Sequence, residues 1–210
     1  MPFYKVRAPA LPQAKDLYDQ RYQNTFADVL RLYFNRLDGD LTALSTRFGG
    51  SQLNVPTASY YDTTTQTAAS INTAYKVKFG AAINQNGIAV SGTGGTRFTV
   101  EKPGIYNVSF TGQKLSSSAS AQEMHVWVAK NGTAVANSAH AYSTHNNLQR
   151  NALHWNYNIV LTANEYIELM WSVDVTTLTL APEGAATPHP AVPSASLTIN
   201  FISNTEGFAT

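Results

Sequence analysis

The sequence predicts a mainly β protein, in which an antiparallel sandwich follows an N-terminal extended arm and an amphipathic α-helix. Two observations predict this fold class. Between residues 75 and 201, short segments alternate apolar and polar side chains with a period of two, with turn signals such as Asn86-Gly87 and Asn131-Gly132 between them. Before residue 50, apolar residues recur every three or four positions, as on one face of a helix.

Residues 1–50 are predicted to form the arm and the helix, and they carry seven of the 14 basic and five of the 13 acidic residues. Prolines in the first 12 residues favour an extended arm. Its apolar side chains, among them Phe3, Tyr4 and Leu11, would bind a partner surface. A frayed terminus is the alternative interpretation.

A helix is predicted over residues 13–48, and one apolar stripe follows it. The stripe consists of Phe26, Leu30, Tyr33, Leu37, Leu41, Leu44 and Phe48. Such a stripe needs a partner, either the same helix of other copies or the body of its own chain. The Gly49-Gly50-Ser51 break favours self-association. Gly39 costs about 1 kcal/mol relative to alanine and is expected to divide the helix.

The stretch 51–74 is rich in Ser, Thr and Ala, and it is predicted to be a linker that leads into a β domain over residues 75–210. Strands are predicted around the alternating residues that follow, with Leu153–Leu161 and Ile167–Val175 the clearest. Short strands with no helical pattern between them favour a sandwich. His125 and Trp127 lie opposite Met124 and Val128, so they are candidates for a face between subunits or for a face partly covered within one subunit.

The hairpin Phe98–Phe110 reads FTVEKPGIYNVSF. Pro103-Gly104 suits a type II turn, in which glycine adopts the positive φ, and Tyr106, Val108 and Phe110 share one face of the strand that follows. An aromatic residue, five residues, and then G-x-Y-x-(apolar)-x-F resembles the core signature of the C1q/TNF-like jelly roll. Phe98, Gly104, Tyr106 and Phe110 fit it, while Val108 stands where that family usually has Phe.

The resemblance extends over about residues 60–204. It implies a jelly-roll sandwich that assembles as a homotrimer. The residues alone lead only to a β-sandwich with more apolar surface than one core needs.

The stretch LPQAKDLYDQRYQNTFADVLRLYFNRLDG resembles an N-terminal module of small virion proteins from tailed bacteriophages, including phages of marine cyanobacteria. Leu11-Pro12, Tyr18-Asp19, Tyr22 and Tyr33-Phe34-Asn35 carry the likeness. The resemblance implies anchoring on a virion through the arm and helix.

Composition and motifs argue against other functions. The charged fraction is 13% with a formal net charge of +1, so nothing favours nucleic acid or an anionic membrane as a partner. No apolar run is long enough for membrane insertion. The chain has no cysteine, no hydrolase or nucleotide-binding motif and no metal-ligand spacing. Glu165 and Glu168 flank a turn and are expected to be solvated. We therefore expect no enzyme, no cofactor and no metal.

The predicted function is a structural protein on the surface of a phage particle, a trimeric appendage or decoration whose partners are its own copies and other virion proteins. The alternative is a receptor-binding adhesin for a host glycan or protein. Its candidate binding loops include Tyr142, His145, Asn146, Asn147 and Arg150, the loop 116–120 and the loop 181–193. A free bacterial C1q-like lectin is disfavoured because the N-terminus lacks a signal-peptide pattern.

Overall fold

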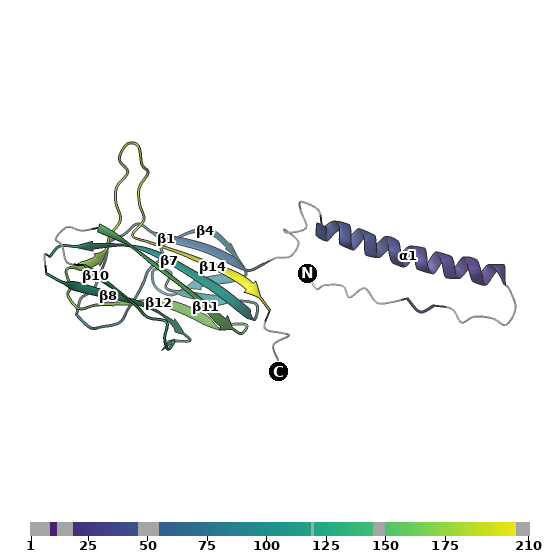
Figure 1. The fold of residues 1–210 in the computed structure, drawn as a ribbon, viewed down its shortest axis with the longest axis horizontal. Helices are drawn as coiled ribbons and strands as arrows, with labels where there is room; N and C mark the ends of the chain where they lie inside the picture. Colours follow the sequence, from purple (N-terminus) through teal and green to yellow (C-terminus); the bar gives the residue numbers. More distant parts are fainter. Residues whose placement is uncertain (1–8, 12–18, 46–54, 119, 145–149, 205–210) are drawn as a thin grey trace. The chain divides into compact units, whose positions relative to one another are not determined.

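The computed structural model describes residues 9–11, 19–45, 55–118, 120–144 and 150–204, with helix side chains described as far as Gly39. The chain divides into two compact units, Met1–Asn54 and Val55–Thr210. The first contains a helix and the second a β-sandwich (Figure 1). The mainly β fold class is therefore confirmed, with two antiparallel sheets and one helix in the described part of the chain.

Asp19 caps the N-terminus of helix α1 (Gln20–Ser45). The Asp19 carboxylate accepts hydrogen bonds from the backbone N–H groups of Arg21 at 2.9 Å and Tyr22 at 3.3 Å. The helix continues unbroken through Gly39, so the expected division there is wrong. A cost of about 1 kcal/mol does not end a long helix whose flanking residues favour the helical state. Residues 13–18 and 46–48, also predicted to be helical, lie outside the described residues.

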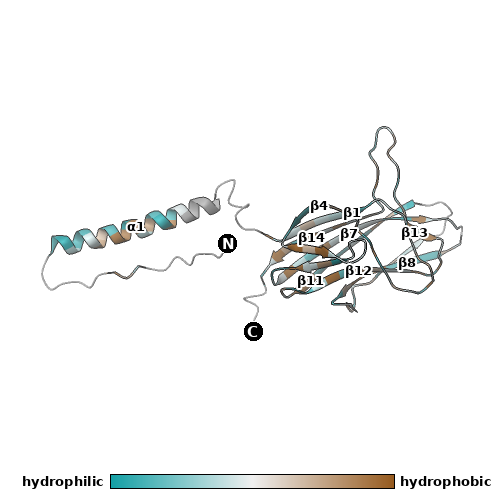
Figure 2. Cartoon of the chain, turned by 180° about the vertical axis from the view of Figure 1, so that it is seen from behind, coloured by the Kyte–Doolittle hydropathy of each residue, from teal (hydrophilic) through white to brown (hydrophobic). Residues whose placement is uncertain are grey.

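The apolar stripe is visible on α1 as a face of reduced exposure. Phe26, Leu30, Tyr33 and Leu37 are half-exposed, whereas Leu32 and Phe34, away from the stripe, are 69% and 58% exposed. Figure 2 shows the resulting alternation of apolar and polar residues along the helix. Within the described part of the first unit, no stripe residue is buried.

The sandwich contains strands β1 to β14. Their bounds are β1 Thr57–Asp62, β2 Gln66–Thr67, β3 Tyr75–Lys76, β4 Ala81–Asn86, β5 Ile88–Ser91, β6 Arg97–Val100, β7 Gly104–Ser116, β8 Gln122–Lys130, β9 Thr133–Ala134, β10 His140–Thr144, β11 Arg150–Leu161, β12 Tyr166–Val173, β13 Leu178–Leu180 and β14 Ala195–Ser203. The predicted alternations along β8, β11 and β12 are confirmed, because their apolar positions lie in the core. Asn131 and Gly132 both adopt positive φ, as the predicted hairpin turn requires.

The two sheets have a jelly-roll order. The first runs β4-β1-β14-β7, with β11 on the other side of β7 and the short pair β13-β2 extending from β7. The second runs β10-β8-β12-β6-β5, with β3 on β12 and β9 on β8. The chain crosses between the sheets eight times, at β2–β3, β3–β4, β4–β5, β6–β7, β7–β8, β10–β11, β11–β12 and β12–β13. The two sheets therefore enclose a single core (Figure 1).

The sandwich begins earlier than the predicted boundary at residue 75. Residues 57–62, assigned above to a linker, form β1 between β14 and β4. Ala58 and Tyr60 face the core, and they are followed by the buried Asp62. Asp62 can occupy this inward position, where an apolar residue is expected, because its carboxylate accepts hydrogen bonds from the backbone N–H groups of Thr64 at 2.6 Å and Gly80 at 3.1 Å. The linker prediction is therefore wrong for these residues.

The resemblance-bearing hairpin lies at the centre of the core. Phe98, Tyr106 and Phe110 are fully buried, and Val108 is 1% exposed. Gly104 does not adopt the positive φ expected of it. It is instead the position where the backbone of β7 meets β14, because a Cβ there would collide with the Phe201 ring and lie 2.7 Å from the carbonyl oxygen of Ser203. The requirement for glycine is thus one of close approach.

Tyr106 is expected to make the sandwich less stable at alkaline pH. Its hydroxyl donates to the carbonyl oxygen of Lys102 at 2.7 Å, and burial, assisted by the negative charge of Glu101, raises its pKa to about 12. The unfolded chain ionises this phenol near its ordinary value of about 10. The stabilisation is therefore complete below about pH 10 and is lost as the pH rises towards 12.

We expect Tyr106→Phe to cost about 1 kcal/mol at neutral pH through the lost hydrogen bond, and to make unfolding less pH-dependent above about pH 10. Urea unfolding at neutral pH and at about pH 11 measures both effects. Parallel losses of stability in both proteins between these two pH values would contradict the assignment.

The outward face of the first sheet is uncharged along its three central strands. From β1, β14 and β7 it presents Thr57, Ser59 and Tyr61, then Ser196, Thr198 and Asn200, then Ile105, Asn107, Ser109, Thr111, Gln113 and Leu115. Several of these groups bond to one another across strands. Thr57 donates to Asn200 at 2.8 Å, and Asn107 donates to Asn158 of β11 at 2.8 Å.

Candidate functional site

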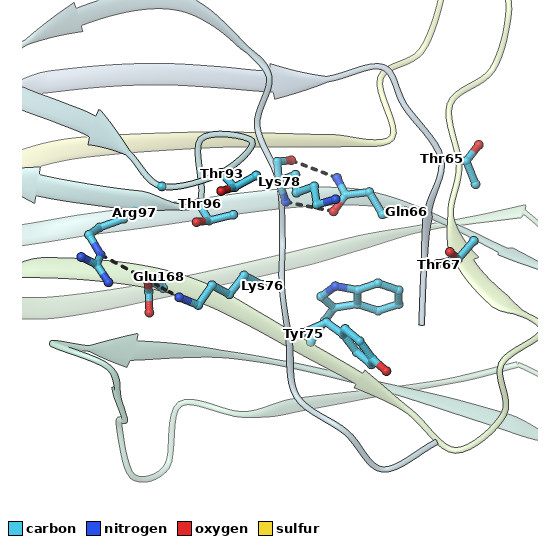
Figure 3. Close-up of a pocket in the computed structure, with 12 residues that line it drawn as sticks. Thr65, Gln66, Thr67, Tyr75, Lys76, Lys78, Thr93, Thr96, Arg97 and Glu168 are labelled. Carbon is cyan, nitrogen blue, oxygen red and sulfur yellow. Dashed lines mark hydrogen bonds and ion pairs between the residues drawn. The ribbon is translucent and has the colours of Figure 1, made fainter. Parts of the chain in front are cut away.

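A pocket of about 490 Å³ opens where residues of both sheets meet. We call it the cationic pocket. Thr65, Gln66 and Thr67 line it from β2 and its approach, Tyr75, Lys76 and Lys78 from β3 and the segment that follows, Gly92, Thr93, Thr96 and Arg97 from the β5–β6 turn and β6, and Glu168 and Trp171 from β12 (Figure 3). Its charged side chains are three cations and one carboxylate.

Glu168 is the buried centre of the charged groups. It is 2% exposed, and its Oε1 lies 2.8 Å from Nζ of Lys76 and 3.3 Å from Nε of Arg97 (Figure 3). The expectation that this carboxylate is solvated is therefore wrong. The period of β12 does place it on the outward face, but side chains from β3 and β6 cover it there. Arg97 is held further by the ring of Tyr166, whose centroid lies 4.0 Å from the guanidinium carbon.

Gln66 fixes the other wall of the pocket. Its amide nitrogen donates to the carbonyl oxygen of Lys78, and its amide oxygen accepts from the N–H of the same residue, both at 2.9 Å (Figure 3). The side chain therefore reproduces a pair of strand hydrogen bonds where strand pairing has stopped. As a result, the backbone that carries Lys78 is held in place independently of any ligand.

The Lys78 side chain runs along a glycine turn. A Cβ on Gly94, which has a φ of +77°, would lie 3.1 to 3.4 Å from the Cδ, Cγ and Cβ atoms of this lysine. Its Nζ has no ion-pair or hydrogen-bond partner in the described part of the chain. Lys78 is thus a positioned cation that remains available for an anion.

Two aromatic residues complete the pocket. The rings of Tyr75 and Trp171 lie 6.0 Å apart between centroids, tilted by 49°. The indole Nε1 of Trp171 is buried without a hydrogen-bond partner among the described residues. Such a buried donor is costly unless an acceptor reaches it.

Glu165, also expected to be solvated, forms hydrogen bonds with two neighbouring turns. It accepts from Lys130 at 2.7 Å, from the N–H of Thr162 at 2.8 Å and from Asn131 at 2.9 Å. These contacts, the Lys130 bond foremost, lower the pKa of the Glu165 carboxyl to about 2. Its role lies in joining the β8–β9 and β11–β12 turns, away from the cationic pocket.

The predicted binding loops are described only in part. His145, Asn146 and Asn147 lie outside the described residues. Tyr142 donates its hydroxyl to the carbonyl oxygen of His154, and Arg150 donates to the carbonyl oxygens of Ala181 at 2.9 Å and Pro182 at 3.0 Å. Tyr142 lies in β10 and Arg150 in β11, so these bonds join β10 to β11 and β11 to the start of the β13–β14 loop. Ligand binding by these loops stays a prediction.

The predicted anchoring residues also divide into described and undescribed ones. Phe3 and Tyr4 lie outside the described residues, as does the side chain of Leu44. Leu11 is 47% exposed. Of the two candidates on β8, His125 lies 3.6 Å from Glu123, and Trp127 is half-buried opposite Met170 of β12.

The described part of the chain contains no group of three or more His, Asp or Glu residues that could hold a metal ion. The helix that it contains is not apolar enough over its length to span a bilayer.

Comparison with known proteins adds little to this description. No family model matches the chain, and no curated protein matches it. Among solved structures, the chain is similar to the globular domain of zebrafish complement 1qA protein, with 15% sequence identity and a TM-score of 0.41 over 71% of this chain and 98% of that chain. The fold assignment therefore rests on the strand order given above.

Sequence reasoning missed the cationic pocket. Lys76 and Lys78 were recognisable as the polar side of a short alternation, but Glu168 lies 92 residues from Lys76 along the chain. No spacing within one segment indicates that these residues meet. The usable signal was a carboxylate inside an otherwise apolar strand.

Proposed function

We propose that the protein is a non-enzymatic structural component of a tailed-phage virion, a trimeric appendage or decoration anchored through its N-terminal unit. The N-terminal resemblance to phage virion modules supports the location. The resemblance of the hairpin to C1q/TNF-like domains supports the trimer. Both supports come from sequence.

The observation that carries the proposal is the apolar stripe on α1. Phe26, Leu30, Tyr33 and Leu37 remain half-exposed in the described part of their own unit, while the core of the sandwich is formed by residues from Ala58 onward. Burying an apolar side chain of this size contributes about 1.5–3 kcal/mol. Association of the stripes of several copies would supply that burial, and joining several anchors in one assembly would strengthen weak docking on the particle.

Where α1 holds the copies together, Leu30→Asp should reduce the oligomer to smaller species, because it places a charge in the middle of the stripe. Leu32→Asp is the matched control, since it makes the same change on the same helix at a side chain that is 69% exposed. Light scattering of both full-length variants gives the mass of the assembly, and circular dichroism reports whether the helix survives.

The proposal makes a second statement about the isolated sandwich. Residues 55–210 contain a complete core of their own and can be tested alone. A trimer of both the full chain and this fragment would leave α1 free as the virion anchor. A trimer of the full chain alone would assign assembly to the helix, whereas monomers in both cases would refute the proposal.

Receptor binding remains the second candidate, and one observation favours it. The loop between β13 and β14 projects from the sandwich (Figure 1), and residues 183–191 are exposed. It is held at its base by the bridge between Glu183 and Val192 and by Arg150. A projecting loop on a rigid scaffold is a suitable recognition element. The two functions can coexist in one appendage.

A further inference from the structure

We propose that the cationic pocket binds an acidic monosaccharide unit, a sugar ring that bears a carboxylate among its hydroxyl groups. This inference does not depend on the proposed virion role, since assembly through α1 requires nothing of the pocket. The volume of about 490 Å³ falls within the range of about 300–1,000 Å³ found for small-molecule sites.

The charges of the pocket select an acid. Lys76, Lys78 and Arg97 against Glu168 leave two net positive charges on the lining. The Glu168 carboxylate already neutralises part of the positive charge of Lys76 and Arg97, through contacts of 2.8 and 3.3 Å. Lys78, which no described carboxylate contacts, is therefore the group that would bind the carboxylate of the ligand.

The hydrogen-bonding groups of the pocket favour a hydroxylated ligand over a bare anion. Glu168 uses only Oε1 in its described contacts, which leaves Oε2 to accept a hydrogen bond from a hydroxyl group. Thr65, Thr67 and Thr93 are exposed at the pocket, and their side chains have no described hydrogen bonds. The Glu168 carboxylate contacts two cations through Oε1 and keeps Oε2 as an acceptor, and an acceptor oxygen binds the hydroxyl group of a polyol but repels phosphate.

The aromatic groups provide a place for the ring itself. Tyr75 is half-exposed at the pocket, so its ring can pack against the C–H face of a sugar. Trp171 lies beside it with a buried indole N–H that lacks an acceptor. A ligand oxygen that reaches this donor would satisfy the one buried polar atom of the pocket that the described residues leave unpaired.

The test is a titration of the full chain with D-glucuronate, with D-glucose as the neutral counterpart of the same ring. Ligand-observed NMR or calorimetry gives the dissociation constants. We expect glucuronate to bind about tenfold more tightly than glucose. Lys78→Gln should weaken glucuronate binding by about five- to tenfold, because it removes the free cation and leaves the Glu168 ion pairs in place. Lys102→Gln, an exposed lysine that does not line the pocket, should leave the affinity unchanged.

Several outcomes would overturn the inference. These are equal binding of glucuronate and glucose, no binding of either at tens of millimolar, or an unchanged affinity in a folded Lys78→Gln protein. Inorganic phosphate and acetate complete the series, and if either matched glucuronate, a simple anion site would replace the sugar site. The mass of the assembly, measured on the same samples, tests the virion proposal separately.

Discussion

Replacing Gly104 with alanine should destabilise the sandwich by about 3 kcal/mol, because the added methyl group has no space. The new Cβ would meet the ring of Phe201 and the carbonyl oxygen of Ser203. The Phe201 ring cannot retreat freely, since it packs edge-to-face on Tyr106 with centroids 5.6 Å apart. Either β14 moves away from β7 or the aromatic pair separates.

The matched control is Gly184→Ala. That glycine has open space around its Cβ position and no positive φ, so the same chemical change should alter stability by less than about 0.5 kcal/mol. Urea unfolding of the two variants measures the difference. Equal stabilities would mean that the close approach of β14 to Gly104 does not exist in solution.

Phe98→Ala should cost about 4 kcal/mol, because it removes a fully buried aromatic ring and leaves a cavity. The ring is fully buried between Tyr60 at 4.9 Å and Phe79 at 5.6 Å between centroids. These three residues come from β1, from the segment after β3 and from β6, so the cavity would lie where the two sheets are joined by side chains alone.

Ile83→Ala serves as the control for this truncation. Ile83 is 70% exposed on β4, so its loss should change the midpoint of thermal unfolding little. The Phe98 variant should show a midpoint lower by many degrees in the same experiment. A similar small shift in both variants would contradict the central place of Phe98 in the core.

The strands that sequence alone predicts are those whose burial comes from apolar side chains. Leu153, Trp155 and Ile159 alternate cleanly along β11, and the structure buries all three. Strand β1 escaped prediction because one of its inward positions is Asp62, whose buried carboxylate accepts hydrogen bonds from the backbone N–H of Gly80 and the hydroxyl of Ser194, both distant in sequence. Periodicity detects burial only where the buried side chain is apolar.

The cationic pocket could not be predicted for a related reason. Its charges come from residues 76, 78, 97 and 168, which meet only because β3 and β6 both pair with β12. The pairing of these strands depends on the whole sandwich. The sequence does contain the residues, yet it gives no local reason to place Arg97 beside Glu168.

The outward face of the first sheet is neutral whereas the cationic pocket is charged, so contacts at the two places should respond differently to ionic strength. Hydroxyl and amide groups that already bond to one another, such as Thr57 with Asn200, can be dehydrated without removing an ion from water. Contacts through that face, or through the apolar residues of α1, should therefore persist as salt is added. Binding at Lys78 should weaken, because dissolved ions screen its charge. Under the two proposals above, added salt would thus release an acidic ligand while leaving association through α1 intact.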